Sequence, residues 1–198
     1  MCMSIKESLI KLKWLPSHIF NKLMLRIHGF SYGKNLTTFG GVFVRGHGTV
    51  IIGNNVKITS CRETNPIGGD TKSIIYAKKN SQITIGNNVG ISNTAIVAMN
   101  SIAIEDNVLI GGGCKIYDHD FHSLDYEMRM QPVDEGVASR PVLIKMGAFV
   151  GAHSIILKGV TIGEKSIVGA GSVVTKDIPD GEIWAGNPAK YIRSNEEI

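Results

Sequence analysis

The side chains best suited to chemistry gather between residues 117 and 129, which read Tyr-Asp-His-Asp-Phe-His-Ser-Leu-Asp-Tyr-Glu-Met-Arg. Two of the six histidines, His119 and His122, lie in this stretch. A histidine titrates near neutral pH, so it can remove the proton of a hydroxyl group as that group attacks a carbonyl carbon. Imidazole and carboxylate groups are also good metal ligands. The stretch therefore fits either a general base or a metal site.

The other histidines and the cysteines favour the first interpretation. His47 and His153 are isolated in the sequence, and an isolated histidine is more often structural than a ligand. The three cysteines are odd in number, widely spaced and without a Cys-x-x-Cys pair, so neither a thiolate zinc site nor a disulfide framework is indicated. We therefore expect no metal, no cysteine nucleophile and a reducing compartment.

The element that positions these residues is a repeat of six. Aliphatic residues recur at every sixth position from residue 144, and a small or aliphatic residue follows each of them by four. The first series is Ile144, Val150, Ile156, Ile162, Val168 and Val174, and the second is Ala148, Ser154, Val160, Ser166, Ser172 and Ile178. An earlier series, with one extra residue after its third member, is Ile85, Ile91, Val97, Ile104, Ile110 and Ile116.

A period of six matches neither an α-helix nor a single strand, but it fits a triangular coil in which six residues supply one short strand and one corner. Three such units close a coil, so Ile144 should stack on Ile162. Glycine and asparagine at residues 86–88, 111–113, 163 and 169 fit corners, where a positive φ is tolerated. A β-sandwich would not keep this spacing. We predict an all-β parallel β-helix of hexapeptide repeats.

Composition agrees with this fold. The 198 residues contain 23 glycines and only 6 prolines, and every glycine lies at or after Gly29. This distribution disfavours a helical bundle, and the absence of a three-residue period excludes collagen. The repeat stops at Ile116 and resumes near Val142. The inserted loop, about 117–141, therefore holds the histidine cluster, as expected of a functional loop on a rigid scaffold.

Residues 1–34 lie outside the repeat, so we expect a basic N-terminal segment (1–34) followed by a β-helix domain (35–198). The segment carries six basic residues and one acidic residue, whereas the rest carries 15 and 16. Its pattern predicts a basic amphipathic helix ended by Pro16 and a second helix capped by Ser17. Residues 1–30 either cover the end of the coil, pack on another subunit or lie on an anionic membrane. The near-neutral body disfavours nucleic-acid binding. With no secretory signal or membrane span, we expect a cytoplasmic protein, peripheral at the inner membrane face if the helix binds lipid.

Residues 162–179, together with Ala-Gly-Asn-Pro-Ala-Lys at 185–190, resemble the C-terminal signature of the hexapeptide-repeat acyltransferases, closest to the maltose, galactoside and exopolysaccharide O-acetyltransferases. The resemblance covers roughly residues 50–193. It implies a left-handed parallel β-helix. It also implies a homotrimer that uses acetyl-coenzyme A at sites between subunits.

The resemblance also implies site residues. The base falls on His122, with His119 as the alternative. The expected acceptor-side residues are Ser92, Asn93, Asp120, Asp125 and Arg129, and Asp120 or Asp125 would orient the imidazole. The expected coenzyme-binding residues are Ala152, Ala170, Thr175, Lys176, Pro188, Lys190 and Arg193, within a C-terminal contact segment of about 183–198. Trp184 stands where a small residue is expected.

The resulting hypothesis is an acetyl-coenzyme A-dependent O-acetyltransferase that acts on a sugar hydroxyl of a surface polysaccharide or its precursor. A histidine would act as general base in direct attack, without a covalent enzyme intermediate. N-acetylation of an amino sugar and acetylation of a small xenobiotic remain alternatives. A non-catalytic trimeric β-helix scaffold is the alternative from a different class.

Overall fold

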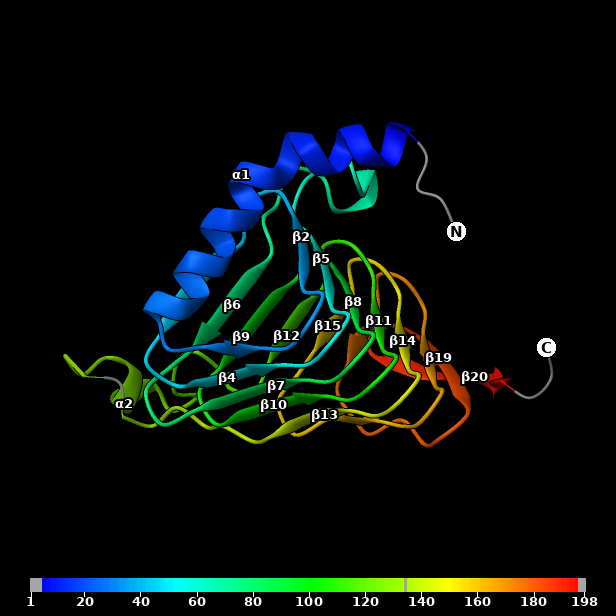
Figure 1. The fold of residues 1–198 in the computed structure, drawn as a ribbon. Coiled ribbons are helices and arrows are strands. Elements are labelled where there is room, and N and C mark those ends of the chain that lie inside the picture. Colours follow the sequence, from blue (N-terminus) through cyan, green and yellow to red (C-terminus); the bar gives the residue numbers. More distant parts are fainter. Residues whose placement is uncertain (1–4, 134, 196–198) are drawn as a thin grey trace.

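The computed structural model describes residues 5–133 and 135–195, so the ends of the predicted N-terminal and C-terminal segments, 1–4 and 196–198, lie outside it. It shows a triangular coil built from three sheets (Figure 1). Every ladder within the coil is parallel, and the only antiparallel ladder joins the last two strands of the described chain. The predicted parallel β-helix is confirmed.

Each coil contributes one strand to each sheet, and we name the sheets after their first strands. The β1 sheet contains β1 (Ser31–Tyr32), β4 (Thr49–Ile52), β7 (Gln82–Ile85), β10 (Ser101–Ile104), β13 (Val142–Ile144) and β16 (Thr161–Ile162). The β2 sheet contains β2 (Thr37–Phe39), β5 (Lys57–Thr59), β8 (Gly90–Ser92), β11 (Leu109–Ile110), β14 (Phe149–Val150), β17 (Ile167–Val168), β19 (Glu182–Gly186) and β20 (Ala189–Ser194). The β3 sheet contains β3 (Phe43–Gly46), β6 (Ile74–Ala77), β9 (Ala95–Ala98), β12 (Lys115–Tyr117), β15 (Ile155–Ile156) and β18 (Val173–Val174).

The aliphatic series forms the core. Ile144 pairs with Ile162, as the repeat predicts, and both side chains are fully buried. The small residues of the second series are buried as well. The prediction that Val97 stacks on Ile116 in the earlier series was wrong. Ile96 pairs with Ile116, and Val97 pairs with Tyr117. Successive side chains of a strand point to opposite faces, so the series is displaced by one residue at β9.

The corners differ in why they need glycine or asparagine. At the asparagine corner, between the β1 and β2 sheets, Asn55, Asn88 and Asn107 have φ near 60° and their side-chain amides donate from one to the next along the stack at 3.0 and 3.1 Å. The predicted positive φ is absent at Gly86, Gly111, Gly163 and Gly169. These glycines are required because the next coil is too close: a Cβ at Gly111 would lie 2.6 Å from the Ala152 nitrogen.

The predicted break at Pro16 was wrong. Helix α1 (Ile5–Ile27) is continuous and contains Pro16, and Figure 1 shows it changing direction along its length. Ser17 does not cap a new helix, because its hydroxyl donates to the Trp14 carbonyl at 2.9 Å. Proline weakens a helix by removing one backbone hydrogen bond. Here packing on β2 and β3 holds the helix across that position.

Two segments leave the coil. Residues 60–73, which contain the short helix η1 (Pro66–Gly68), connect β5 to β6, and this excursion was not expected from the sequence. Residues 118–141 connect β12 to β13 and contain α2 (Tyr126–Arg129), close to the predicted loop. Arg140 and Asp120 donate their backbone nitrogens to the Asp118 and Ala138 carbonyls, so the loop closes where it began. In both cases the next strand resumes the register of the coil.

Candidate functional site

The centre of the candidate site is a buried pair, Asp118 and His119, at the histidine corner, where the chain passes from the β3 sheet to the β1 sheet of the next coil. Both side chains are completely buried. His119 Nδ1 lies 2.8 Å from Asp118 Oδ1. A carboxylate only accepts hydrogen bonds, so Nδ1 carries the proton and donates. The lone pair of the imidazole therefore lies on Nε2.

Asp118 is held rigidly. Its two carboxylate oxygens accept hydrogen bonds from the backbone nitrogens of Met99 and Asn100, at 2.8 and 2.7 Å. These nitrogens belong to the neighbouring coil, so the scaffold fixes the carboxylate and the carboxylate fixes the imidazole. From the sequence, Asp118 was considered only as part of a possible metal site, and Asp120 or Asp125 was expected to orient the imidazole. The position of Asp118 directly after β12, next to a histidine, was the available signal.

His119 Nε2 is buried and has no hydrogen-bond partner among the described residues. Burial lowers the pKa of His119 below its usual value near 6.5, and Lys78 lowers it further, while the hydrogen bond to Asp118 and the nearby carboxylates oppose the shift. The net lowering keeps the ring neutral at physiological pH. A neutral imidazole with an unpaired Nε2 is the form that accepts a proton.

An aromatic side chain covers the histidine. The ring centroids of Phe121 and His119 are 4.4 Å apart, and Tyr117 meets Phe121 edge-on at 4.8 Å. Phe121 has φ of 67°, a backbone conformation unusual for a bulky residue, and is 43% exposed. The partly exposed Phe121 ring thus packs against the buried imidazole of His119.

The remaining loop residues are placed differently from expectation. Asp120 accepts a hydrogen bond from Lys158 Nζ, and its second oxygen is buried without a partner among the described residues. Asp125 caps α2 by accepting from the Met128 nitrogen at 3.0 Å, and Arg129 donates to the Ser123 carbonyl at 2.7 Å. These two residues fold the loop. His122 is exposed.

The predicted acceptor-side residues Ser92 and Asn93 lie where β8 ends, at the corner between the β2 and β3 sheets, one coil before His119 and at a different corner. Ser92 lines an open cleft of about 300 Å³ together with Lys57, Thr59, Leu109 and Phe149. Asn93 is completely buried beneath residues 60–73, where its amide donates to the Thr71 carbonyl at 2.5 Å. The cleft therefore presents Ser92 and not Asn93.

The predicted coenzyme residues divide between two corners and a hairpin. Ala152 and Ala170 follow β14 and β17 at the glycine corner, between the β2 and β3 sheets. Thr175 and Lys176 follow β18 at the histidine corner, and both are exposed. Because the two corners are different edges of the triangle, one protomer does not bring these pairs together.

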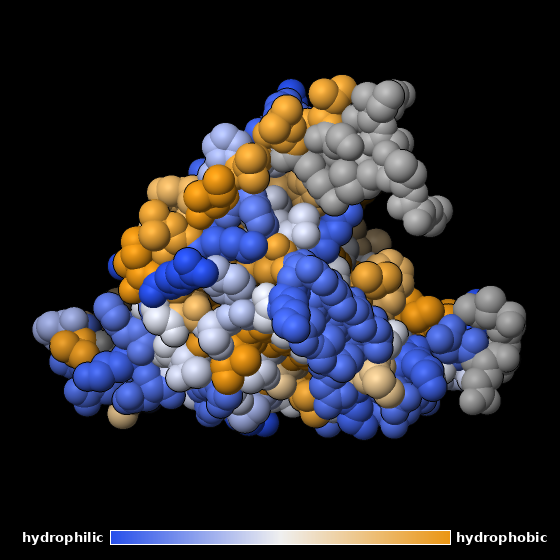
Figure 2. All heavy atoms as spheres, in the orientation of Figure 1, coloured by the Kyte–Doolittle hydropathy of each residue, from blue (hydrophilic) through white to orange (hydrophobic). Residues whose placement is uncertain are grey.

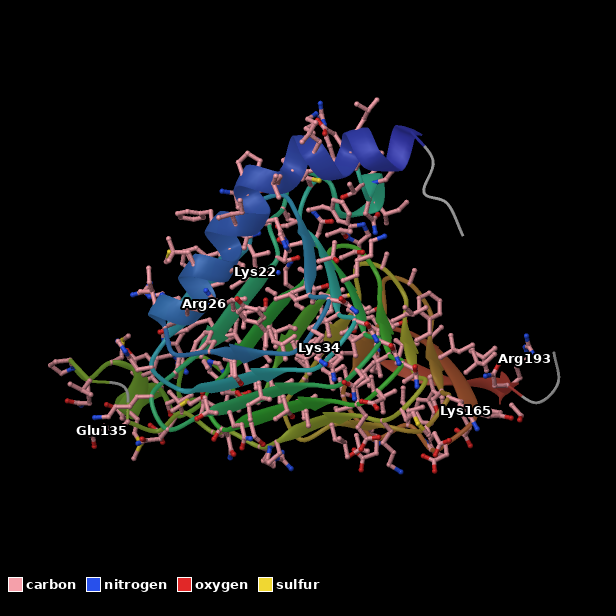
Figure 3. The ribbon with its side chains drawn as sticks, viewed as in Figure 1. Lys22, Arg26, Lys34, Glu135, Lys165 and Arg193 are labelled. Carbon is pink, nitrogen blue, oxygen red and sulfur yellow. The ribbon has the colours of Figure 1, made fainter. Side chains whose placement is uncertain are left out.

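The hairpin of β19 and β20 carries the other predicted coenzyme contacts. Pro188 and Lys190 are exposed, and Arg193 is partly exposed toward the end of β20, where Figure 3 labels it. Trp184 pairs with Val168 and packs against the core. Its indole nitrogen donates to Glu182 Oε2 at 2.6 Å. Trp184 thus closes the C-terminal end of the core.

No group of three or more metal-ligating side chains occurs within residues 5–133 and 135–195. Over the same ranges, no helix combines the length and apolar character needed to cross a membrane.

The fold and the repeat define a class of architecture, a left-handed β-helix of hexapeptide repeats, and in it this chain is similar to the hexapeptide-repeat acyltransferases. A family model, the hexapeptide repeat of succinyl-transferase, matches residues 141–176. The chain is 38% identical over 120 residues to galactoside O-acetyltransferase of Escherichia coli, covering 60% of this chain and 57% of that protein. The matched segments span between 44% and 61% of the length of the first curated relatives.

Solved structures show the same likeness over most of the chain. AntD, an N-acyltransferase from Bacillus cereus crystallised as a variant with dTDP and coenzyme A, has a TM-score of 0.67 and 27% identity and covers 87% of this chain and 88% of its own. The polySia-specific acetyltransferase NeuO has a TM-score of 0.57 at 27% identity, with coverages of 84% and 82%. The resemblance stated from the C-terminal signature is confirmed.

Proposed function

We propose that this protein is an acetyl-coenzyme A-dependent O-acetyltransferase that acts on a sugar hydroxyl and uses His119 as its general base. The observation that carries the proposal is the buried Asp118–His119 pair with an unpartnered Nε2. The 38% sequence identity with a galactoside O-acetyltransferase over 120 residues supports a hydroxyl group as the acceptor. The similarity to AntD, which was crystallised with coenzyme A, supports acetyl-coenzyme A as the donor. His119, the alternative base from the sequence, is favoured over His122 because Asp118 fixes its tautomer.

In the proposed reaction, the acceptor hydroxyl donates its proton to His119 Nε2 as its oxygen attacks the thioester carbonyl carbon. The π electrons of the thioester carbonyl move to the carbonyl oxygen, which gives a tetrahedral intermediate with an oxyanion. The oxyanion then collapses, the carbon–sulfur bond breaks, and the coenzyme sulfur takes the proton from Nε2. Asp118 stabilises the transient imidazolium through the Nδ1 hydrogen bond. Because the His119 side chain is completely buried against Phe121, the proposed reaction requires Phe121 to move aside for the acceptor.

Acetyl-coenzyme A, the proposed donor, requires small side chains beside its pantetheine arm, which is rich in amide groups, and cations near its phosphates. Ala152 and Ala170 at the glycine corner fit the first requirement. Lys176 and Lys190 fit the second as point charges, and Arg193 fits as a bidentate partner. Because these residues lie on two corners of one protomer, we propose that a homotrimer forms the sites, with the histidine corner of one protomer facing the glycine corner of the next.

The acceptor and place of action follow from the same proposal. A surface glycan or its precursor is the proposed acceptor, and the cleft at Ser92 is the proposed acceptor wall. The similarity to NeuO, a polySia-specific acetyltransferase, supports a glycan. We propose that the protein works in the cytoplasm.

N-acetylation of an amino sugar is the second candidate. The similarity to AntD, an N-acyltransferase, specifically favours it. The same histidine would then remove a proton from an amine instead of a hydroxyl group. The acceptor alone decides between the two reactions.

The test is thiol release from acetyl-coenzyme A with a panel of sugars and their 2-amino counterparts. His119→Ala should lower turnover by about 10²–10⁴-fold, whereas His122→Ala should retain most of it. Full activity of His119→Ala, or the same loss in His122→Ala alone, would overturn the assignment of the base. Turnover with amino sugars only would establish the N-acetyl alternative. Failure of the protein to bind coenzyme A in calorimetry would reject both reactions.

A further inference from the structure

Helix α1 leaves one face uncovered. Seven large apolar side chains on this face are between 45% and 66% exposed. They are Leu9, Leu12, Leu15, Ile19, Phe20, Leu23 and Ile27, which we call the apolar stripe. Their mostly three- and four-residue spacing places them along one side of the helix. Figure 2 shows this band of hydrophobic side chains following the helix at the edge of the molecule.

The opposite face of α1 is anchored, so the stripe cannot turn inward. Asn21 is buried, donates to Thr38 Oγ1 and the Gly40 carbonyl at 2.9 and 2.8 Å, and accepts from the Val42 nitrogen at 3.0 Å. Leu25 joins the hydrophobic core. The stripe is therefore a fixed outer surface of the folded protein.

Cations border the stripe. Lys22 and Arg26 lie over the Tyr32 ring at 5.7 and 5.8 Å, on the side of the helix facing the coil (Figure 3). Ile19, Lys22, Leu23, Arg26 and Tyr32 together line a shallow, mostly apolar depression. Glu7 is the only acidic residue of the first 34. The surface thus combines an apolar ridge with a positively charged margin.

This combination decides between two occupants. A second copy of the stripe, packed face to face about a two-fold axis, would bring Lys22 and Arg26 near cations of the same kind, and Glu63, an acid beside the helix, already pairs with Lys13. A membrane containing anionic lipids supplies both an apolar layer for the side chains and negative headgroups for the margin. The long stems of lysine and arginine allow their charges to stay at headgroup level.

We propose that the apolar stripe of α1 binds the surface of membranes that contain anionic lipids, with the helix lying in the plane of the interface. The interaction holds the protein at the membrane without a spanning segment. It stands on the helix alone and is independent of the acetyl-transfer chemistry.

The test is flotation of the full-length protein with vesicles of phosphatidylcholine alone or mixed with phosphatidylglycerol. The protein should float at least tenfold more with the anionic vesicles, and added salt should weaken the binding. Leu12→Ser/Ile19→Ser/Leu23→Ser should lower partitioning by tenfold or more. Lys22→Ser/Arg26→Ser should lower it about tenfold and remove most of the salt dependence. Ile51→Ser, which changes an exposed residue of β4, is the control and should bind normally.

Circular dichroism and light scattering on each variant separate lipid binding from folding and assembly. A folded triple variant that floats like the wild type overturns the proposal, as does a wild type that ignores anionic vesicles. A triple variant that loses mass in light scattering but still floats assigns the stripe to contact with a second copy instead. Thiol release with a soluble acceptor should be unchanged in every variant.

Discussion

At the scale of single residues, the site depends on where one proton lies. The Asp118 carboxylate accepts three hydrogen bonds, two from the backbone of the neighbouring coil and one from His119. This arrangement fixes the imidazole tautomer before any substrate arrives. Burial then sets the charge of the ring, because the charged form loses solvation. Asp118 therefore fixes the position of the His119 ring. The pKa of His119 is set by burial, which lowers it, and by the hydrogen bond to Asp118, which raises it.

We expect kcat/KM to rise with pH through a midpoint below 6.5, because the pKa of His119 is lowered and only the neutral ring accepts a proton. Asp118→Asn should lower the plateau by at least about tenfold. It should also move the midpoint to still lower pH, because the hydrogen bond to Asp118 raises the pKa of His119 and the variant weakens it. The pH profile of thiol release measures both effects. An unchanged midpoint in Asp118→Asn would mean that a different group is the base.

At the scale of elements, hydrogen bonds between corner side chains add to the backbone ladders of the strands. At the asparagine corner of the first four coils, Asn35, Asn55, Asn88 and Asn107 form a column in which each side-chain amide donates to the next. The left-handed backbone conformation at these positions suits asparagine better than most residues.

Asn88→Ala should therefore lower the free energy of unfolding by about 1–2 kcal/mol, since it removes two amide hydrogen bonds and leaves a Cβ at a positive φ. Asn88→Gly should recover up to about 1 kcal/mol of this loss, because glycine tolerates the conformation without restoring the hydrogen bonds. Urea unfolding of the two variants separates the contributions. Equal losses would show that backbone strain plays no part.

Helix α1 depends on one buried amide in the same way. Asn21→Ala should cost about 2–4 kcal/mol, because the Val42 nitrogen and the Gly40 carbonyl lose their buried partner. Lys13→Ala, which removes an exposed ion pair with Glu63, should cost less than about 1 kcal/mol and is the control. Limited proteolysis should release α1 from the first variant and spare it in the second. If α1 were equally resistant to proteolysis in both variants, the contacts that anchor the helix would lie at Leu25 and not at Asn21.

At the scale of the whole molecule, the proposed site requires two protomers. His119 and Lys176 lie at the histidine corner, whereas Ala152 and Ala170 lie at the glycine corner. A closed ring of three protomers would create three equivalent sites from these edges.

Mixing two inactive variants tests this arrangement. His119→Ala removes the base, and Ala170→Trp fills the glycine corner, so each alone should be inactive. In equal mixtures refolded together, about a quarter of the sites should combine an intact histidine corner with an intact glycine corner, and activity should return to about that fraction. Mixtures that stay inactive would mean that both corners act within one protomer.

Sequence periodicity was sufficient for the core and the coil, because a parallel stack buries the same positions in every turn. It was insufficient at β9, where the extra residue in the repeat led to the prediction of Val97 in place of Ile96 as the stacked residue. It was also insufficient at Pro16, where packing outweighed a local helix breaker. The histidines were found by type and loop position. The proposal of His119 over His122 rests on the contacts of Asp118 with the adjacent coil, which no local pattern contains.

The two excursions from the coil have a consequence for how such a protein changes over generations. Residues 60–73 and 118–141 each depart at a corner, and the following strand takes up its normal register. Segments inserted at corners can therefore change without displacing the strands that follow them. Under the proposed function, exchange of these segments would alter the surface beside the site, while the coils that carry the proposed coenzyme contacts stay the same. One stack of turns can in this way carry many different surfaces.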